Sequence, residues 1–197
     1  MLIIGLTGGI GMGKTVLASQ LAALGAKIIN ADDIVHRLLS KGGAAVAPVA
    51  RHFPQAVKNG TVDRKILGDI VFKDSPKRHM LESILHPLVI AEEIHFMQRQ
   101  RRRGAKVIVL EIPLLFETGG EKRCDVTIVA SAPLFLQHRR VMQRPNMTEE
   151  KFRRILAAQM PDREKRRRAD AVILTGLGRA YSFRKLKQLV KSLCAAK

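Results

Sequence analysis

The chain has 197 residues, 46% of them hydrophobic and 26% charged, which excludes a disordered chain and allows a sizeable core. Its apolar runs are broken by charge before the roughly 18 residues that a membrane-spanning helix needs, and we expect no signal peptide. A formal net charge of +18, from 35 Lys and Arg against 17 Asp and Glu, favours an anionic partner. With one Tyr, seven Phe and no Trp, the chain offers little for base stacking, so we expect no specific nucleic-acid partner.

Short apolar runs alternate with helical patterns along the chain. Strands are expected at Met1–Leu6, Ala26–Asn30, Lys106–Ile112, Asp125–Ser131 and Ala169–Thr175. A helix is expected over Lys14–Leu24, ended by Gly25, and another over Leu81–Gln100. This alternation predicts an α/β fold with a parallel five-stranded sheet covered by helices on both faces. The interval from Asp32 to Gln100 exceeds one crossover helix, so part of it is expected to form a subdomain beside the sheet.

A glycine-rich loop lies between the first strand and the first helix. Its residues match the P-loop pattern G-x-x-x-x-G-K-[ST] and are Gly8, Gly9, Ile10, Gly11, Met12, Gly13, Lys14 and Thr15. In such a loop the backbone N–H groups and the helix N-terminus surround the phosphates of a nucleotide. Lys14 would reach the β- and γ-phosphates, and the Thr15 hydroxyl would ligate Mg²⁺. The sequence therefore predicts binding of ATP or GTP, with Val16 next to the nucleotide, and a fold of the P-loop NTPase type.

Two carboxylates follow predicted strands, where ligands collect in open α/β sheets. Glu111, at the end of the strand in IVLEIPLLFE, could hold the Mg²⁺ shell through water, or it could be an edge residue in solvent. Asp32, in NADDIVHR, could accept a proton from a hydroxyl that attacks the γ-phosphate. It could equally be a helix N-cap, and Asp33 could compete for the catalytic role.

Residues 139–168 are rich in arginine and lysine, with eleven basic and four acidic side chains. The pattern suggests two helices joined near Pro145 and Asn146, the second capped by Asn146 or Thr148. An arginine on a mobile lid could stabilise the charge that develops during phosphoryl transfer, and lid closure would exclude water. For Arg153, Arg154 and the run 163–168 we favour a solvated charged face.

The remaining reactive residue types give weaker signals. Cys124 and Cys194 follow no metal-ligand spacing, so we expect reduced structural thiols and a cytoplasmic setting. The six histidines share no metal-ligand spacing either. His86 stands before a proline in ILHPLV, where a structural role competes with a functional one.

Several blocks in order resemble the dephospho-CoA kinase family. They run from about Leu2 to Ile173 and comprise GLTGGIGMGKT, IINADDIVHR, GTVDRKILGDIVFKDSPKRHMLESILHPLV, IPLLFE, RRVMQRPNMTEEKFRRILAAQM and RRRADAVI. The P-loop is shared with very many proteins, whereas ILHPLV, PLLFE and ILAAQM in this order are far more specific.

The resemblance implies one kinase domain over residues 1–197. Its core would comprise 1–32, 105–137 and 169–197, with a helical substrate-binding part at about 33–100 and a lid at about 138–168. The enzyme would transfer the γ-phosphate of ATP to the ribose 3′-hydroxyl of dephospho-CoA, with Mg²⁺, in the last step of coenzyme A synthesis. By position, Asp32 becomes the presumed base, and Thr7 lies near the reacting phosphates. Arg140 becomes the lid arginine directed at ATP, with Arg144 as a weaker candidate, and the acceptor site would be lined or supported by His86, Pro113, Leu114 and Leu115.

The chain also departs from the pattern of that family. Asn30 stands at the first aspartate of the family's D-A-D, Pro145 replaces the usual aspartate after Arg144, and Thr175 falls where an aspartate and asparagine turn usually approaches the adenine. Contacts to the adenine would then come from backbone groups, or the preference for ATP would be relaxed. Three other readings stay open: a kinase for another small acceptor, an ATPase or GTPase that binds nucleic acid, and a regulatory, catalytically weak relative.

Overall fold

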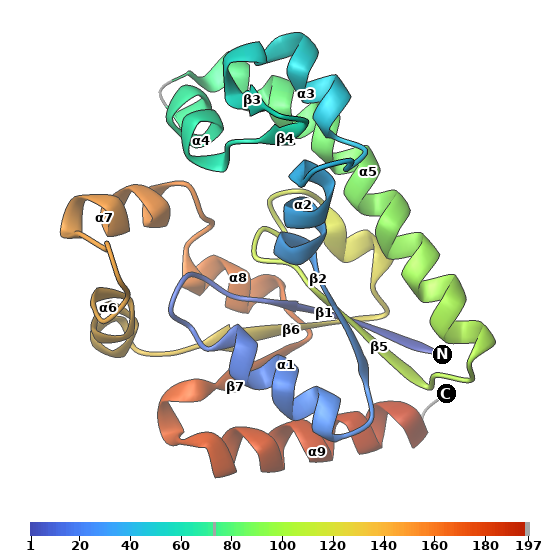
Figure 1. Cartoon of the computed structure of the whole chain (residues 1–197). Helices are drawn as coiled ribbons and strands as arrows, with labels where there is room; N and C mark the ends of the chain where they lie inside the picture. Colours follow the sequence, from blue (N-terminus) through green and yellow to red (C-terminus); the bar gives the residue numbers. More distant parts are fainter. Residues whose placement is uncertain (73, 196–197) are drawn as a thin grey trace. The chain divides into compact units, whose positions relative to one another are not determined.

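The computed structural model describes residues 1–72 and 74–195 (Figure 1). Its contacts divide the chain into two compact units, and each is described here by itself. The first unit comprises Met1–Ile29 and the chain from Gln100 onward, and the second unit is Asn30–Arg99.

A five-stranded sheet forms the centre of the first unit. Its order is β2 (Lys27–Asn30), β5 (Val107–Glu111), β1 (Leu2–Thr7), β6 (Val126–Ser131) and β7 (Ala171–Leu174). Strand β1 pairs in parallel with β5 and β6, and β6 pairs in parallel with β7. The predicted five-stranded sheet is therefore confirmed. Because the strands run in parallel, the carboxyl ends of β1, β5, β6 and β7 lie at one edge of the sheet.

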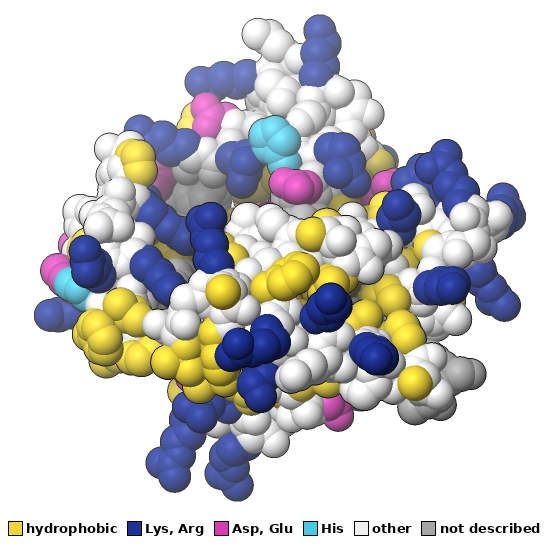
Figure 2. Space-filling model, turned by 90° about the horizontal axis from the view of Figure 1, so that it is seen from below, with side chains coloured by type: hydrophobic (Ala, Val, Ile, Leu, Met, Phe, Trp, Pro, Cys, Tyr) yellow, Lys and Arg dark blue, Asp and Glu magenta, His cyan; other side chains and the backbone are white. Residues whose placement is uncertain are grey.

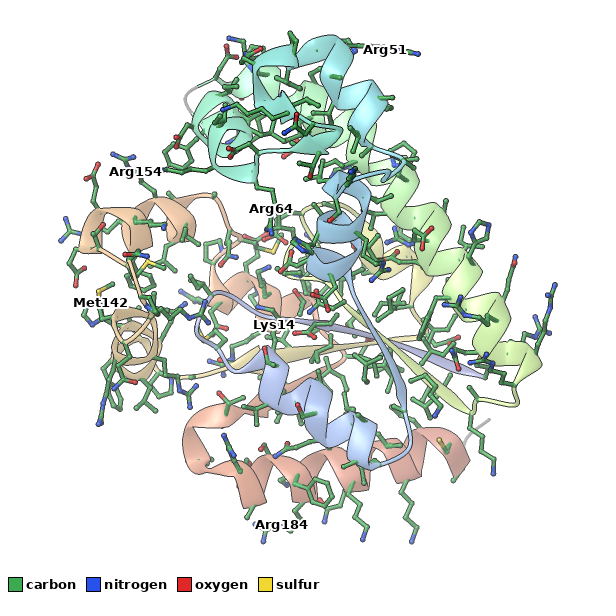
Figure 3. All side chains as sticks on the ribbon, in the orientation of Figure 1. Lys14, Arg51, Arg64, Met142, Arg154 and Arg184 are labelled. Carbon is green, nitrogen blue, oxygen red and sulfur yellow. The ribbon has the colours of Figure 1, made fainter. Side chains whose placement is uncertain are left out.

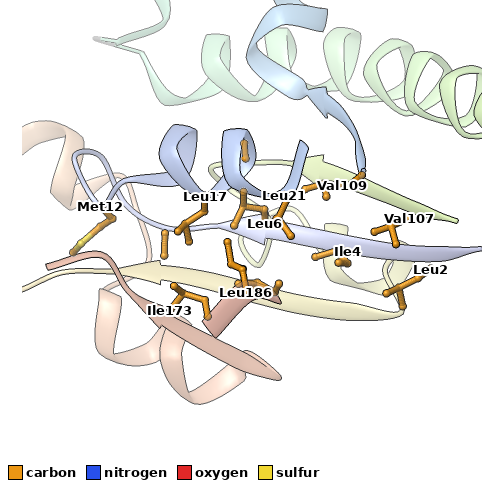
Figure 4. Close-up of a cluster of buried hydrophobic side chains, with 14 of the residues drawn as sticks. Leu2, Ile4, Leu6, Met12, Leu17, Leu21, Val107, Val109, Ile173 and Leu186 are labelled. Atoms are coloured by element: carbon orange, nitrogen blue, oxygen red, sulfur yellow. The ribbon is translucent and has the colours of Figure 1, made fainter. Parts of the chain in front are cut away.

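Helices α1 (Lys14–Ala23) and α9 (Arg179–Ala195) pack against each other and bury the main core of this unit. Alternate residues of β1, namely Leu2, Ile4 and Leu6, belong to this core, as the two-residue period of a strand requires (Figure 4). They meet Leu17 and Leu21 of α1 and Leu186 of α9. The core thus fixes α1 directly behind the loop that follows β1.

Three further helices follow β6 in the chain: α6 (Leu134–Met142), α7 (Glu149–Ala157) and α8 (Asp162–Arg168). The predicted helix break near Pro145 is confirmed, and the Thr148 side chain caps α7 by accepting a hydrogen bond from the Lys151 N–H (3.2 Å). Helix α8 contacts β6. Two short 3₁₀ turns, η2 (Gly120–Arg123) and η3 (Thr175–Leu177), complete the unit.

The second unit is largely helical. Its elements are α2 (Ala31–Leu39), α3 (Val46–His52), η1 (Pro54–Ala56), β3 (Val57–Lys58), β4 (Thr61–Val62), α4 (Arg64–Phe72) and α5 (Ser75–Arg102), whose last three residues belong to the first unit. Buried Ile34, Val49, Phe53 and Leu67 come from α2, α3, the turn after it and α4. The antiparallel pair β3–β4 was not predicted from the sequence, because two-residue strands carry too short a pattern to detect.

Among the described residues, no helix is both long and apolar enough to cross a membrane. On the face in Figure 2, Lys and Arg side chains far outnumber Asp and Glu, in keeping with the net charge of +18. Arg184 projects outward from α9 (Figure 3).

Candidate nucleotide site

The glycine loop occupies the six residues between the end of β1 at Thr7 and the start of α1 at Lys14. Gly8, Gly11 and Gly13 all have positive φ angles, of 146°, 73° and 91°. A Cβ atom at Gly8 would lie 2.5 Å from the backbone oxygen of Ala130, which cannot move aside without bending β6. The loop can therefore turn tightly over the carboxyl edge of the sheet only with glycine at this position.

Backbone N–H groups of the loop and of the α1 start are left for a ligand. Among the described residues, the N–H groups of Gly11, Gly13 and Thr15 donate to no acceptor of the chain. Helix α1 has Gly13 at its N-cap position and therefore no capping side chain. Since a helix N-terminus also carries partial positive charge, this arrangement suits the oxygens of a phosphate.

Lys14 lies at the first position of α1, and its side chain folds back over the loop (Figure 3). Its ammonium donates hydrogen bonds to the backbone oxygens of Gly8 (2.6 Å) and Gly9 (3.3 Å). The positive charge is thereby held at backbone oxygens of the loop rather than extended into solvent.

Thr7 and Glu111 lie on adjacent strands at the carboxyl edge of the sheet. Thr7 is fully buried, and its hydroxyl donates to the backbone oxygen of Pro113 (3.0 Å). Glu111 is paired in register with Leu6 and is only 5% exposed. Solvent exposure of Glu111, the alternative considered from the sequence, is therefore wrong. Leu115 is also fully buried, and its side chain approaches Gly5 of β1, so it supports the sheet by packing against that strand.

Arg140, on α6, contacts the loop and the end of β7. Its guanidinium donates to the Gly11 oxygen (3.3 Å), to the Thr175 hydroxyl (3.0 Å) and to the Thr175 backbone oxygen (2.9 Å). The Thr175 hydroxyl in turn donates to the Met12 oxygen (2.7 Å). The structure thus brings Arg140 to the loop, whereas Arg144 is exposed beyond the end of α6.

Lys165 is a central residue of this unit that the sequence interpretation missed. The run 163–168 was expected to be solvated, but Lys165 is completely buried on α8. Its ammonium bonds both carboxylate oxygens of Glu117 (2.8 and 3.0 Å) and the backbone oxygen of Pro113 (3.0 Å). Pro113 therefore links Lys165 to the Thr7 hydroxyl. One lysine among the seven consecutive charged residues 162–168 gives no sequence signal that it points inward.

Asp32 and His86 belong to the second unit. The Asn30 side chain is the N-cap of α2 and accepts hydrogen bonds from the N–H groups of Asp32 (2.8 Å) and Asp33 (3.3 Å). An N-cap role for Asp32 is therefore wrong; it lies in the first turn of α2 with its side chain exposed. Within this unit as described, the Asp32 carboxylate accepts no hydrogen bond. His86 is exposed on α5, directly before Pro87.

A pocket of about 420 Å³ opens beside the start of α1. It is lined by Thr15, Val16, Ser19, Gln20, Ala23, Arg179 and Phe183, so it lies between α1 and the beginning of α9. Thr15, at the second position of α1, lines this pocket. Among the described residues, no group of three or more His, Cys, Asp or Glu side chains is placed to hold a metal ion.

The parallel sheet, the glycine loop and the uncapped α1 start together define a fold of the P-loop NTPase class. A family model for dephospho-CoA kinase matches residues 2–177, and the chain belongs to that family, whose members phosphorylate dephospho-CoA to make coenzyme A.

Individual relatives agree with this family. A dephospho-CoA kinase of Paramagnetospirillum magneticum is 52% identical over 166 residues, which cover 84% of this chain and 78% of that protein. A solved structure from Thermus thermophilus is 36% identical, with a TM-score of 0.84, and the match covers 98% of this chain and 97% of that one. The dephospho-CoA kinase of Campylobacter jejuni is 28% identical, with a TM-score of 0.73 and 98% of each chain covered.

Proposed function

We propose that this protein transfers the γ-phosphate of ATP to the 3′-hydroxyl of the ribose of dephospho-CoA, giving coenzyme A and ADP. The observation that carries the proposal is the uncapped start of α1 behind the glycine loop, in a chain of this kinase family. The N–H groups of Gly11, Gly13 and Thr15 would bind phosphate oxygens. Lys14 would exchange its bonds to the Gly8 and Gly9 oxygens for bonds to the β- and γ-phosphates.

Mg²⁺ fits the oxygen donors of this site. Among the described residues the Thr15 hydroxyl makes no hydrogen bond, so it is available as a ligand, and the Glu111 carboxylate could hold the shell through water. Hydroxyl and carboxylate oxygens are the donors that Mg²⁺ prefers, and the nucleotide phosphates would supply others. When bound, the ion would neutralise charge on the phosphates.

Asp32 is proposed as the general base. The ribose oxygen would form a bond to the γ-phosphorus while the bond from that phosphorus to the β–γ bridging oxygen breaks, and the hydroxyl proton would pass to the Asp32 carboxylate. Its exposure and its lack of a hydrogen bond within its own unit leave the carboxylate available for this role. Asp33 is the alternative, because it occupies the same helical turn.

Other residues would bind the two substrates. Arg140 is proposed to act on the ATP phosphates, which would require exchange of its present bonds to Gly11 and Thr175, and Arg144 is a second candidate. The acceptor would be bound or supported by His86, Pro113, Leu114 and Leu115. The basic surface would attract both polyphosphate substrates rather than a specific nucleic acid.

Thr175 bears on the choice between ATP and GTP. Its hydroxyl is already engaged with Met12 and Arg140, so base contacts near this residue would come from backbone groups. We propose that either such backbone contacts read the base or the preference for ATP over GTP is relaxed, and a comparison of the two donors tests the relaxed preference. A strong preference for ATP over GTP in initial rates would contradict this point alone.

A cytoplasmic setting is proposed as well. It is supported by Cys124 and Cys194, neither of which forms a disulfide in the described part of the chain, as suits a reducing compartment.

The test is to incubate the protein with Mg-ATP and dephospho-CoA and to detect coenzyme A by mass. AMP or water in place of the acceptor provides the specificity controls. We expect coenzyme A only with dephospho-CoA, and a loss of at least about 100-fold in kcat for Asp32→Asn. Asp33→Asn is the matched control, since it alters the neighbouring carboxylate.

The possible results separate the parts of the proposal. Full activity of Asp32→Asn, or a larger loss in Asp33→Asn, would refute the assignment of Asp32 while keeping the substrate. Binding of ATP without formation of coenzyme A would refute the reaction itself. Phosphorylation of AMP would instead support a kinase for another small acceptor, and ATP hydrolysis stimulated by RNA or DNA would support an ATPase that binds nucleic acid.

A further inference from the structure

Two glutamines hold the backbone of one loop residue, Ile10, from opposite sides. The Ile10 N–H donates to Oε1 of Gln159 (3.0 Å), and the Ile10 backbone oxygen accepts from Nε2 of Gln137 (2.8 Å). Gln137 lies on α6 and Gln159 lies just after α7, so both are more than 120 residues from Ile10 in the chain. Both backbone groups of Ile10 are therefore used inside the protein and cannot turn toward a phosphate.

The orientation of each side-chain amide is fixed by its partner. A backbone N–H can bond only to the oxygen of Gln159, and a backbone oxygen can bond only to the nitrogen of Gln137. Gln137 is 3% exposed, so its bond is shielded from water and is costly to lose. The two glutamines thus have opposite roles, one as acceptor and one as donor.

In addition to these two hydrogen bonds, apolar packing holds the Ile10 side chain. The Ile10 side chain is buried in a small cluster with Val141 of α6 and Phe152 of α7. Gln137, Arg140 and Val141 are spaced so that they share one face of α6, and all three contact the loop at Ile10 or Gly11. The first half of the loop is therefore fixed by α6 and α7.

We propose that Gln137 and Gln159 are positioning residues that hold the Ile10 peptide and so keep the following N–H groups aimed at the nucleotide phosphates. This inference rests on the proposed function for its catalytic consequence. The N–H group of Gly11 follows the Ile10 oxygen in the same peptide, so a rotation of that peptide would turn the Gly11 N–H away from a ligand. We call Gln137 and Gln159 together the Ile10 clamp. The clamp acts through the backbone of Ile10 and touches no substrate.

The test uses the opposite polarity of the two glutamines. Gln159→Glu keeps an oxygen for the Ile10 N–H, whereas Gln137→Glu places an oxygen against the Ile10 oxygen. Gln159→Leu and Gln137→Leu remove both bonds, and the exposed Gln188 of α9, changed to Glu and to Leu, is the control. The measurements are the Kd of ADP by calorimetry, kcat and both KM values, and the melting temperature of each variant.

We expect both leucine variants to weaken ADP binding and to raise the KM for ATP by about tenfold, with the KM for dephospho-CoA changed less than about twofold. Gln159→Glu should stay within about twofold of the unaltered protein, and Gln137→Glu should match its leucine variant. Should a leucine variant fail to fold, the two glutamate variants decide by themselves.

Equal loss in Gln159→Glu and Gln159→Leu would overturn the proposal. So would tight ADP binding in Gln137→Glu, or lower melting temperatures with unchanged ADP affinity. If the unaltered protein binds ADP but makes no coenzyme A, the proposed function fails, while the contrast in ADP affinity still decides the clamp.

Discussion

Helix α1 of the first unit begins differently from three helices of the second unit. In the second unit, side chains cap the starts of three helices: Asn30 for α2, Asp63 for α4 and Asp74 for α5. In the first unit, α1 begins at Lys14 with Gly13 at its N-cap position, and no side chain of the described residues caps it. A capped start satisfies its own N–H groups, whereas an uncapped start beside a rigid loop keeps them for a ligand. At α1 the open N–H groups lie beside the glycine loop, which suits binding of a phosphate, whereas the three capped starts have their N–H groups satisfied within the fold.

The polar groups around α1 are also distributed differently from those around α2. The loop is held by interior bonds from Gln137, Gln159 and Thr175, all more than 120 residues away in the chain. The α2 start is held by Asn30, one residue before the helix. A loop held by distant elements depends on the whole unit, whereas a locally capped helix depends on one side chain.

The largest expected effect on nucleotide binding comes from placing a carboxylate cap at the start of α1. In Gly13→Asp, the new Cβ would lie about 3.0 to 3.2 Å from three atoms of Thr175 at a φ of +91°, and the carboxylate would compete with phosphate for the N–H groups. We expect ADP affinity to fall by about 1,000-fold, or about 4 kcal/mol, measured by calorimetry.

Gly60→Asp is the matched control for this change. Gly60 also has a positive φ, of 73°, but a Cβ atom there would have no other atom within 4 Å, and the residue belongs to the turn between β3 and β4. This variant should lose about 1 kcal/mol of unfolding free energy and keep its ADP affinity. Equal ADP binding by Gly13→Asp and Gly60→Asp would contradict the idea that the α1 start is reserved for phosphate.

Removing the buried ammonium of Lys165 tests how much bonds between distant residues contribute to the stability of the first unit. Lys165→Met would leave the Glu117 carboxylate without its cation and the Pro113 oxygen without one of its donors. We expect the unfolding free energy, measured in urea, to fall by about 3 kcal/mol. Arg167→Met, on the exposed side of the same helix, should change it by less than about 0.5 kcal/mol. A loss below about 1 kcal/mol for Lys165→Met would show that the pair is dispensable.

These contrasts explain which features could be predicted from the sequence. The strands, α1 and the glycine loop were predictable because their signals are local: apolar runs, glycine spacing and the Lys14–Thr15 pair. The roles of Lys165, Gln137 and Gln159 were not, because each depends on a partner 48 to 149 residues away in the chain. Asn30 lay between these cases: its cap is local, but the same pattern also allowed Asp32 to be the cap.

Removing the Asn30 cap of α2 tests whether a locally capped helix depends on a single side chain. Asn30→Ala deletes the oxygen that accepts from the N–H groups of Asp32 and Asp33, so the unfolding free energy in urea should fall by about 1 kcal/mol. Asn30→Asp keeps an acceptor at the positive end of the helix and should stay within about 0.5 kcal/mol. ADP affinity should be unchanged in both. A large loss of ADP binding in Asn30→Ala would show that the cap also serves the nucleotide site.

The smallest expected effect concerns the cap of α5 and its dependence on pH. The Lys77 N–H donates to the Asp74 carboxylate (3.0 Å), and this bond, followed by the bond from the Lys77 ammonium, lowers the pKa of Asp74 below its ordinary value of 3.8. Because the pKa is lower in the folded than in the unfolded chain, the carboxylate contributes stability above the unfolded value, and this contribution is lost as pH falls through the folded value. The pair is exposed, so the contribution is small and weakens with added salt.

A carboxyl-carbon NMR titration should give Asp74 a pKa below 3.8, and Lys77→Gln, which keeps the backbone bond, should raise this pKa only in part. Full return to 3.8 in Lys77→Gln would mean that the ammonium, and not the backbone N–H of the helix start, controls this carboxylate, and the capped starts of the second unit would then owe less to the helix itself.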